Sequence, residues 1–413
     1  MARSRKRVNG EMAGVGGTPS APVVAIPSTV AVRCFGAAIL ADGSRTEAGR
    51  WYDVAPDVAA YWEARGLWVT QATIDALWQS AGRVLTPDGV ASHYEAARPT
   101  AGALRVLQVT HFDPGASVYR YHSAANTTGG VVSAFVRFGH SNPHCDLRQF
   151  DGVADKDAVR ILLATADVVH CHMDYTVLLN ELGGLPDGMR AAITYHGSLE
   201  ASRPSITYPD ADARMRSIVF GARPYHKRFG DHVTWLPIPM PVADYVALAK
   251  RPTTGPFRVA HSPTRREIKG TDAFLAAVAQ LQAEGVAIEA VLIEGLEHGA
   301  ALRLKATCHA TFDSFWLGMQ GSGLEAAAMG QAVVAGSWDA DYGRVGLPMP
   351  WTVAEEPDAL RETLRRLATD PTFYATEAAR VGAYVKARHD YPVVGAIYRN
   401  TLTEATRGTR HID

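Results

Sequence analysis

Two patterns of hydrophobic and polar positions alternate from residue 104 towards the end of the chain. Short runs that are apolar almost throughout are each followed by a segment with helical periodicity. An apolar run is typical of a strand buried on both faces, and a 3.6-residue period is typical of a helix with one buried face. In the first half the successive segments are ALRVLQVTHF, VVSAFVRFG, DKDAVRILLATA, DVVHCHM, YTVLLNEL, AAITYHGS and SIVFGAR. Their order predicts an α/β fold with a parallel sheet.

The same pattern repeats after a proline-rich segment. Pro237, Pro239 and Pro241 predict a stiff crossing between two domains, because proline disfavours helix there. Beyond it, one buried helix face is predicted from Phe274, Ala277, Val278 and Leu281, and another from Leu360, Leu364 and Leu367. The last stretch, AARVGAYVKARHDYPVVGAIYRNTL, predicts two helices that separate near Tyr391–Pro392.

These patterns divide the chain into six parts. The predicted parts are a disordered basic tail (1–29), a small accessory module (30–72), a helix and linker (73–103), a first Rossmann-like domain (104–245), a second Rossmann-like domain (246–388) and a terminal helix (389–413). The small module is weakly similar to accessory modules of phage-encoded proteins, which would place the gene in a virus or prophage.

Composition narrows the functional classes. Lys and Arg number 41 against 42 for Asp and Glu, so no global field recruits polyanions. The four cysteines have neither disulfide nor zinc-pair spacing, and no apolar run has the length of a membrane span. These features predict a reduced cytoplasmic protein. No P-loop or nucleophile elbow occurs, which disfavours ATPase and hydrolase functions.

Two strand-to-helix junctions between Val259 and Gly336 carry the candidate chemistry. One has three cations, Arg265, Arg266 and Lys269, and the other is rich in glycine, with Gly318, Gly321 and Gly323. Helix N-termini favour anions, glycine lets the backbone approach a ligand closely, and Arg and Lys neutralise phosphate. The predicted ligand is a nucleotide diphosphate.

The combined motifs resemble the donor-binding domain of glycosyltransferase family 4, which has the GT-B fold. The resemblance rests on HSP..R..KGT, on a strand ending in IEG before His298, and on FD…G…G…LEA.AMG..VVA. It extends over roughly residues 104 to 405, because VVHCH, TYHGS and LPIPM stand where the family has comparable segments. It implies two domains facing a cleft and a last helix that crosses back to the first domain. It also implies a nucleotide diphosphate-sugar, such as a UDP-sugar, as co-substrate, with no further cofactor.

The resemblance implies roles for individual residues. Arg266 and Lys269 match the basic pair that neutralises the departing diphosphate, and Ser262, Arg265, Gly318, Gly321 and Ser322 belong to the matching donor-binding segments. Glu325 matches the glutamate that holds the ribose hydroxyls, although Ser322 and Glu325 also have the spacing of a capping box. His196 matches a histidine near the transferred sugar, or is a structural residue. Gly115 would let the diphosphate or acceptor approach its backbone. Leu317 departs from the family, which commonly has a glutamate there.

The acceptor is the least determined substrate. Candidate contacts are Asp113, Arg120, Arg223, Lys227 and Arg228, and the last three belong to a basic stretch that suits a phosphate backbone or is a solvated face. A hydroxymethylated pyrimidine in DNA is therefore one candidate, flipped out of the helix. Saccharides and lipids are alternatives. The resemblance implies retention at the anomeric carbon, whereas Asp113 as a general base would give inversion.

Three other functions are compatible with the sequence. A nucleotide-sugar epimerase or hydrolase would use the same fold without an acceptor, and a non-catalytic sensor would explain Leu317. His170 and His172, with His140, His144 and Cys145 upstream, suggest zinc, but no complete ligand set is identifiable, and we predict no metal.

Overall fold

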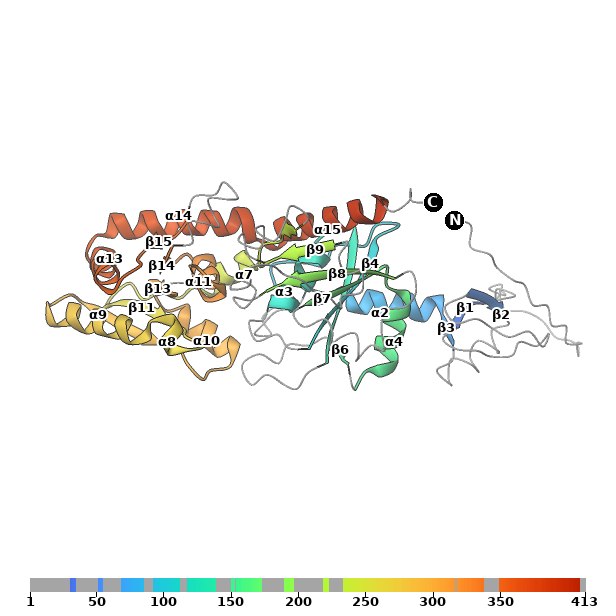
Figure 1. Cartoon of the computed structure of the whole chain (residues 1–413), viewed down its shortest axis with the longest axis horizontal. Coiled ribbons are helices and arrows are strands. Elements are labelled where there is room, and N and C mark those ends of the chain that lie inside the picture. Colours follow the sequence, from blue (N-terminus) through green and yellow to red (C-terminus); the bar gives the residue numbers. More distant parts are fainter. Residues whose placement is uncertain are drawn as a thin grey trace, which may run out of the picture.

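The computed structural model consists mainly of two parallel sheets with helices on their faces (Figure 1). It describes residues 30–34, 51–54, 68–84, 92–111, 117–138, 150–152, 154–172, 189–196, 218–222, 233–315, 318–337 and 349–408. The predicted α/β class is confirmed. Within these residues, no helix is both long and apolar enough to cross a membrane.

The first domain is built on a seven-stranded parallel sheet in the order β10-β9-β8-β7-β4-β5-β6. The strands are β4 (Leu104–Thr110), β5 (Val131–Arg137), β6 (Phe150–Asp151), β7 (Val168–His172), β8 (Arg190–Tyr195), β9 (Ile218–Gly221) and β10 (Val233–Trp235). Helices α3 (Ser117–Asn126) and α4 (Lys156–Thr165) follow β4 and β6. Every residue of β5 and β7 is buried, which explains why these strands are apolar almost throughout.

The second domain has a five-stranded parallel sheet in the order β12-β11-β13-β14-β15. The strands are β11 (Phe257–His261), β12 (Ile288–Leu292), β13 (Ala310–Phe312), β14 (Ala332–Ala335) and β15 (Thr352–Val353). The helices are α7 (Val242–Leu248), α8 (Arg266–Lys269), α9 (Thr271–Ala283), α10 (His298–Lys305), α11 (Gly321–Ala328), α13 (Pro357–Thr369) and α14 (Pro371–His389). The predicted buried faces of α9 and α13 are both confirmed.

Two segments of the chain cross between the domains side by side. The proline-rich segment lies against the end of α14, where the Met240 N–H donates to the His389 carbonyl at 2.6 Å and His389 Nδ1 lies 2.9 Å from the Ile238 carbonyl oxygen. Beyond Asp390, α15 (Tyr391–Gly408) runs over the first domain, while α14 runs along the second (Figure 1). Its buried residues Val394, Tyr398 and Leu402 pack in one cluster with residues of the first sheet.

Docking of α15 depends on a glycine at its contact with α3. A methyl group on Gly395 would overlap the carbonyl oxygen of Ala124 and lie 2.9 Å from Thr128 Cγ2. We expect Gly395→Ala to lower the free energy of unfolding by about 1–3 kcal/mol, because neither helix can move without disturbing a packed core. The measurement is urea unfolding of the full chain.

The matched control is Gly382→Ala in α14. There, among the described residues outside the helix's own backbone, the added methyl meets only the Ala327 carbonyl, at an ordinary 3.5 Å. Alanine should therefore be neutral or stabilise the helix by up to about 1 kcal/mol. Equal unfolding midpoints for the two variants would contradict the packing described for α15.

A small antiparallel sheet precedes the first domain. Its order is β2-β1-β3, formed by β1 (Val30–Cys34), β2 (Trp51–Val54) and β3 (Trp68–Thr70). Helix α2 (Gln71–Ala81) then packs into the core of the first domain, where the Trp78 indole N–H donates to Thr165 Oγ1 at 2.8 Å. The helix is thus anchored to the first domain. Residues 1–29 lie outside the described residues.

Candidate functional site at the junction of the two sheets

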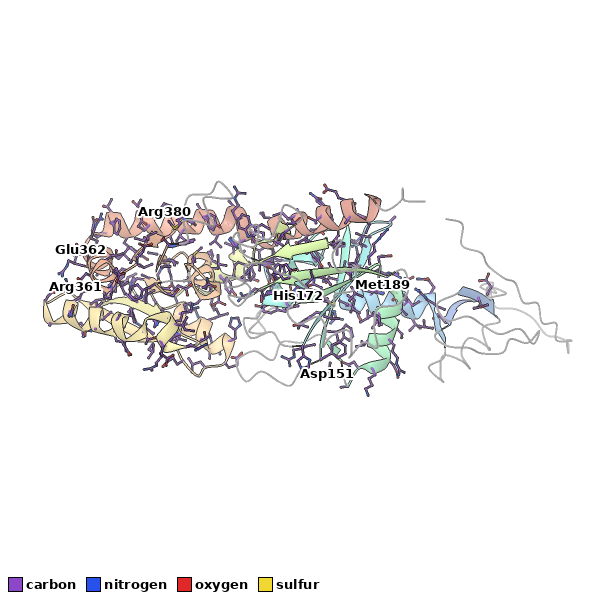
Figure 2. All side chains as sticks on the ribbon, viewed as in Figure 1. Asp151, His172, Met189, Arg361, Glu362 and Arg380 are labelled. Carbon is purple, nitrogen blue, oxygen red and sulfur yellow. The ribbon has the colours of Figure 1, made fainter. Side chains whose placement is uncertain are left out.

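The carboxyl edges of the two sheets meet. Figure 2 shows His172, the last residue of β7, on the side of the first sheet that is nearer the second domain, and Met189, which precedes β8, on the far side. Helices α3 and α11 begin at the carboxyl edges of the two sheets, and they contact each other through Arg120 and Glu325. We call these edges and the helices beginning there the junction. Ligands of open parallel sheets bind at such edges.

Glu325 accepts hydrogen bonds from side chains of two helices, α3 and α10. Its Oε1 accepts from Arg120 Nη2 at 2.6 Å and from His298 Nε2 at 3.0 Å, and its Oε2 accepts from Lys305 Nζ at 2.6 Å. Arg120 also donates to the Tyr245 hydroxyl of α7 at 2.9 Å. Burial alone would raise the pKa of Glu325, but Lys305, His298 and Arg120 hold that pKa well below its ordinary value. Glu325 is therefore a carboxylate that joins the two domains.

The capping-box interpretation of Ser322 and Glu325 is wrong. Helix α11 begins at Gly321 with Gln320 as its N-cap, so Ser322 lies inside the first turn. Its Oγ accepts from Lys305 Nζ at 2.9 Å instead of capping the helix.

The N-terminus of α11 is capped by the carboxylate of Asp313, which follows β13. Asp313 Oδ2 accepts the N–H groups of Gln320 at 2.5 Å and Gly323 at 3.0 Å. Between them, the N–H groups of Gly321 and Ser322 have no hydrogen-bond partner among the described residues.

Asp313 also binds one of the predicted cations. Lys269 Nζ donates to Asp313 Oδ1 at 2.7 Å, and both side chains are buried. Burial would raise the pKa of Asp313, but Lys269 and the two backbone N–H groups lower it. Lys269 is thereby held close to the N-terminus of α11.

The other two predicted cations face solvent. Arg266 is half-exposed and donates through Nε to Glu294 Oε1 at 2.8 Å. Arg265 is exposed and is the N-cap of α8. The structure therefore separates Lys269, which points into the fold, from Arg266, which is paired on the surface.

The glycine-rich loop contains three different kinds of glycine. Gly318 has φ +58°, a left-handed conformation that favours glycine. A methyl on Gly323 would lie 2.7 Å from Asp313 Oδ2, so this glycine allows the cap to form. Apart from its own helix backbone, no atom of the described residues lies within 4 Å of the position of a methyl added to Gly321, so this side of the first residue of α11 is open.

Three buried polar atoms at the junction have no hydrogen-bond partner among the described residues. They are Nδ1 of His111, which follows β4, Oγ of Ser262, which follows β11, and Nδ1 of His298, which begins α10. Buried polar groups are nearly always paired, so each of these three atoms has capacity for one more hydrogen bond.

The histidines of β7 hydrogen-bond to other side chains. His170 lies 2.6 Å from both the Tyr398 hydroxyl and Thr194 Oγ1, and His172 lies 2.8 Å from His196 Nε2 and 3.0 Å from Gln108 Oε1. Burial lowers the pKa of both well below the ordinary histidine value. Within the described residues, no group of three His, Cys, Asp or Glu side chains is arranged to hold a metal.

The architecture matches known structures. No protein-family model and no curated protein sequence matches the chain. An α-glucosyltransferase in complex with UDP and a 13-mer DNA superimposes with a TM-score of 0.54 at 12% identity, covering 74% of this chain and 100% of that one. HepE of Anabaena, in complex with UDP and glucose, gives 0.50 at 13% identity, covering 73% and 99%. The chain has the GT-B fold.

Within this GT-B fold, several predicted residues meet at the junction. They are His196 of the first domain and Ser262, Lys269, Gly321, Ser322 and Glu325 of the second. Arg120, an acceptor candidate, is fully buried against Glu325. Asp113, Gly115, Arg223, Lys227, Arg228 and Leu317 lie outside the described residues.

Sequence reasoning missed Lys305 and Asp313 at the junction, and Gln108 behind it. For Asp313 a signal existed, because the FD dipeptide stands where a strand meets the glycine-rich loop. Lys305 occupies the last turn of α10, where a lysine is ordinary, and only the fold brings it to Glu325.

Proposed function

We propose that this chain is a glycosyltransferase that moves a sugar from a nucleoside diphosphate-sugar, with UDP as the expected nucleotide, to a hydroxyl acceptor. One observation carries the proposal. Among the described residues of the junction, three buried cations, Arg120, Lys269 and Lys305, accompany two buried carboxylates, Asp313 and Glu325. A buried surplus of positive charge is costly without an anion, and a diphosphate would supply one.

The backbone supports the same ligand. The N–H groups of Gly321 and Ser322 stand at the N-terminus of α11 without partners among the described residues, and Lys269 is held nearby through Asp313. A phosphate there would gain N–H donors, the helix dipole and a lysine charge together. In the reaction the bond from the anomeric carbon to the phosphate oxygen breaks, a bond to the acceptor oxygen forms, and the proton of the acceptor hydroxyl passes to the departing phosphate. Charge thus develops on the departing diphosphate, where these donors stabilise it.

Glu325 has capacity for one more hydrogen bond. A carboxylate offers about four lone-pair positions, and Arg120, His298 and Lys305 occupy three of them. Oε2, which accepts only from Lys305 among the described residues, would receive one ribose hydroxyl without displacing Arg120. We therefore retain Glu325 as the proposed ribose contact.

For the acceptor we propose a hydroxymethylated pyrimidine in DNA, with retention at the anomeric carbon. Support comes from the α-glucosyltransferase of the same fold, which was solved with UDP and DNA. Arg223, Lys227 and Arg228 are the candidate contacts for the DNA backbone. A saccharide or lipid acceptor is the alternative, and the mass of the product distinguishes them.

Gly321→Ala tests the donor site directly. The methyl would enter open space, so the unfolding midpoint should equal that of the wild type. It would also stand where the phosphate approaches the backbone, and we expect UDP to bind about tenfold more weakly, a change of about 1.4 kcal/mol. Titration calorimetry with UDP measures the effect, with Gly382→Ala as the control. Unchanged UDP affinity in Gly321→Ala would contradict this donor site.

A further inference from the structure

A chain of side-chain hydrogen bonds leads from the junction into the first domain. His196 Nε2 lies 2.8 Å from His172 Nδ1, and His172 Nε2 lies 3.0 Å from Gln108 Oε1. Gln108 Nε2 then donates to Ser133 Oγ at 3.0 Å, and Ser133 Oγ lies 3.3 Å from His122 Nδ1. We call this series the histidine chain. All its members except His196 are fully buried.

Which atoms donate and which accept along the histidine chain can be worked out from His122, the member farthest from the junction. Asn126 Nδ2 lies 3.4 Å from His122 Nε2, but it donates its two hydrogens to the backbone carbonyls of Arg83 at 3.0 Å and Ser133 at 3.1 Å. It has no hydrogen left for His122 Nε2, which favours a hydrogen on Nε2 itself. Burial lowers the pKa of His122 to about 3. The ring is therefore neutral, with hydrogen on Nε2 and a bare Nδ1.

This direction determines the hydrogens of the next members. The bare Nδ1 of His122 accepts the Ser133 hydroxyl hydrogen, so Ser133 Oγ has only lone pairs for Gln108. The Gln108 amide accordingly presents its Nε2 to Ser133 and its Oε1 to His172. His172 must therefore carry a hydrogen on Nε2.

The same reasoning reaches His196. Burial keeps His172 neutral, since it lowers that pKa well below the ordinary value, and its Nδ1 is consequently bare. The bare Nδ1 accepts from His196, whose hydrogen must be on Nε2. In this Nε2–H tautomer Nδ1 has a lone pair, and its partner in the structure is Oγ of Ser117, the first residue of α3, at 3.5 Å.

We propose that Gln108 and His172 are positioning residues that hold His196 in the Nε2–H tautomer, so that its Nδ1 accepts a hydrogen bond from a substrate hydroxyl. The tautomer follows from the histidine chain alone, whereas the hydroxyl partner rests on the proposed function. A ring nitrogen that only accepts attracts a hydroxyl and repels a phosphate oxygen, which has only lone pairs. It would therefore direct a hydroxyl of the sugar or of the acceptor towards the first domain and the diphosphate towards the second.

Histidine ring nitrogens report their protonation directly in two-bond ¹H–¹⁵N correlation spectra of the full chain labelled with ¹⁵N-histidine. The His196 signals are identified by their loss in His196→Asn. We expect Nε2 protonated and Nδ1 bare in the wild type. A wild-type spectrum with Nδ1 protonated would overturn the proposal without any further variant.

Gln108→Met tests the cause of the tautomer. It removes the acceptor of His172 Nε2–H while nearly preserving side-chain volume, and an unpaired buried N–H shifts the tautomer ratio by about tenfold or more towards His196 with Nδ1 protonated. We expect turnover to fall with the population of the Nε2–H form while UDP affinity is unchanged. A tautomer identical to that of the wild type would overturn the role of Gln108.

The matched control is Thr194→Val, which removes a buried hydroxyl 2.6 Å from His170 Nε2, outside the histidine chain. It should leave the His196 spectrum unchanged.

Adding the substrates one at a time shows whether the hydroxyl that bonds His196 Nδ1 belongs to the donor sugar or to the acceptor. A shift of the Nδ1 resonance on adding UDP-glucose alone places the hydroxyl on the donor, and a shift that requires hydroxymethylated DNA places it on the acceptor. The expected tautomer with no shift for either ligand would refute the hydroxyl partner. Absence of sugar transfer with the expected tautomer would refute the proposed function but not the histidine chain.

Discussion

Glu325→Gln should lower the free energy of unfolding by about 3–5 kcal/mol, the range typical of breaking a buried ion pair by removing one partner. The carboxylate bonds Arg120, His298 and Lys305, and the amide leaves two buried cations without their anion. An amide NH₂ also places hydrogens in front of groups that are themselves donors. Because Arg120 belongs to the first domain and Lys305 to the second, the loss should reduce the unfolding midpoint of both domains.

Urea unfolding of the full chain measures this effect, with Glu294→Gln as the matched control. Glu294 also pairs with an arginine, but Arg266 and Glu294 are both partly exposed, and solvent screening leaves such surface pairs with little effect on stability. Both substitutions replace a carboxylate with an amide. The difference between their losses of unfolding free energy therefore reports the burial of Glu325 and its contacts at the junction. A loss below 1 kcal/mol for both variants would contradict a buried Glu325 that joins the domains.

Acidification from pH 7 to pH 5.5 should lower the free energy of unfolding by about 4 kcal/mol. Burial depresses the folded-state pKa of His122, His170 and His172, and that of His122 falls to about 3. The unfolded chain protonates these rings below about 6.5, whereas the folded protein does not. Their contribution to stability is therefore complete above pH 6.5 and is lost progressively below it. Each histidine contributes up to about 1.4 kcal/mol per pH unit.

The buried histidines and the buried carboxylates change the stability of the protein in different pH ranges. The pKa values of Asp313 and Glu325 are lowered from 3.8 and 4.5, so their contribution declines only in more acidic solution. His261 and His309, whose pKa values burial also lowers, act in the same direction as the three rings. Urea unfolding at half-unit intervals of pH gives the slope. A free energy of unfolding that stays constant from pH 7 to pH 5 would show that these rings are not buried as neutral groups.

The fold was predictable because its signals are local and repeated. Apolar strands such as ALRVLQVTHF followed by amphipathic helices specify a parallel α/β sheet without knowledge of long-range contacts. The helix face of Phe274, Ala277, Val278 and Leu281 follows from spacing alone and is buried as predicted. The same local reasoning failed at Ser322 and Glu325, because the spacing of a capping box does not reveal that Asp313 already caps the helix.

The junction was only partly predictable, because its pairs join residues that are far apart in sequence. Arg120 and Glu325 are separated by 205 positions, and nothing near either residue indicates the other. The motif around Lys269 identified a cation, but its pairing with Asp313 depends on the packing of α8 beside the end of β13. The histidine chain is similar: VVHCH showed two histidines on one strand, which suggested zinc as readily as hydrogen bonds to Gln108 and Tyr398.

The central claim, sugar transfer from a nucleoside diphosphate-sugar, is tested most directly by product analysis. The wild-type protein is incubated with a panel of nucleotide-sugars, with and without DNA containing hydroxymethylated pyrimidines, and released nucleotide and DNA mass are recorded. We predict release of UDP and a gain of one sugar mass on the hydroxymethylated DNA only. UDP release with unmodified DNA would move the acceptor to a saccharide or lipid. Neither binding nor release for any nucleotide-sugar would contradict the account.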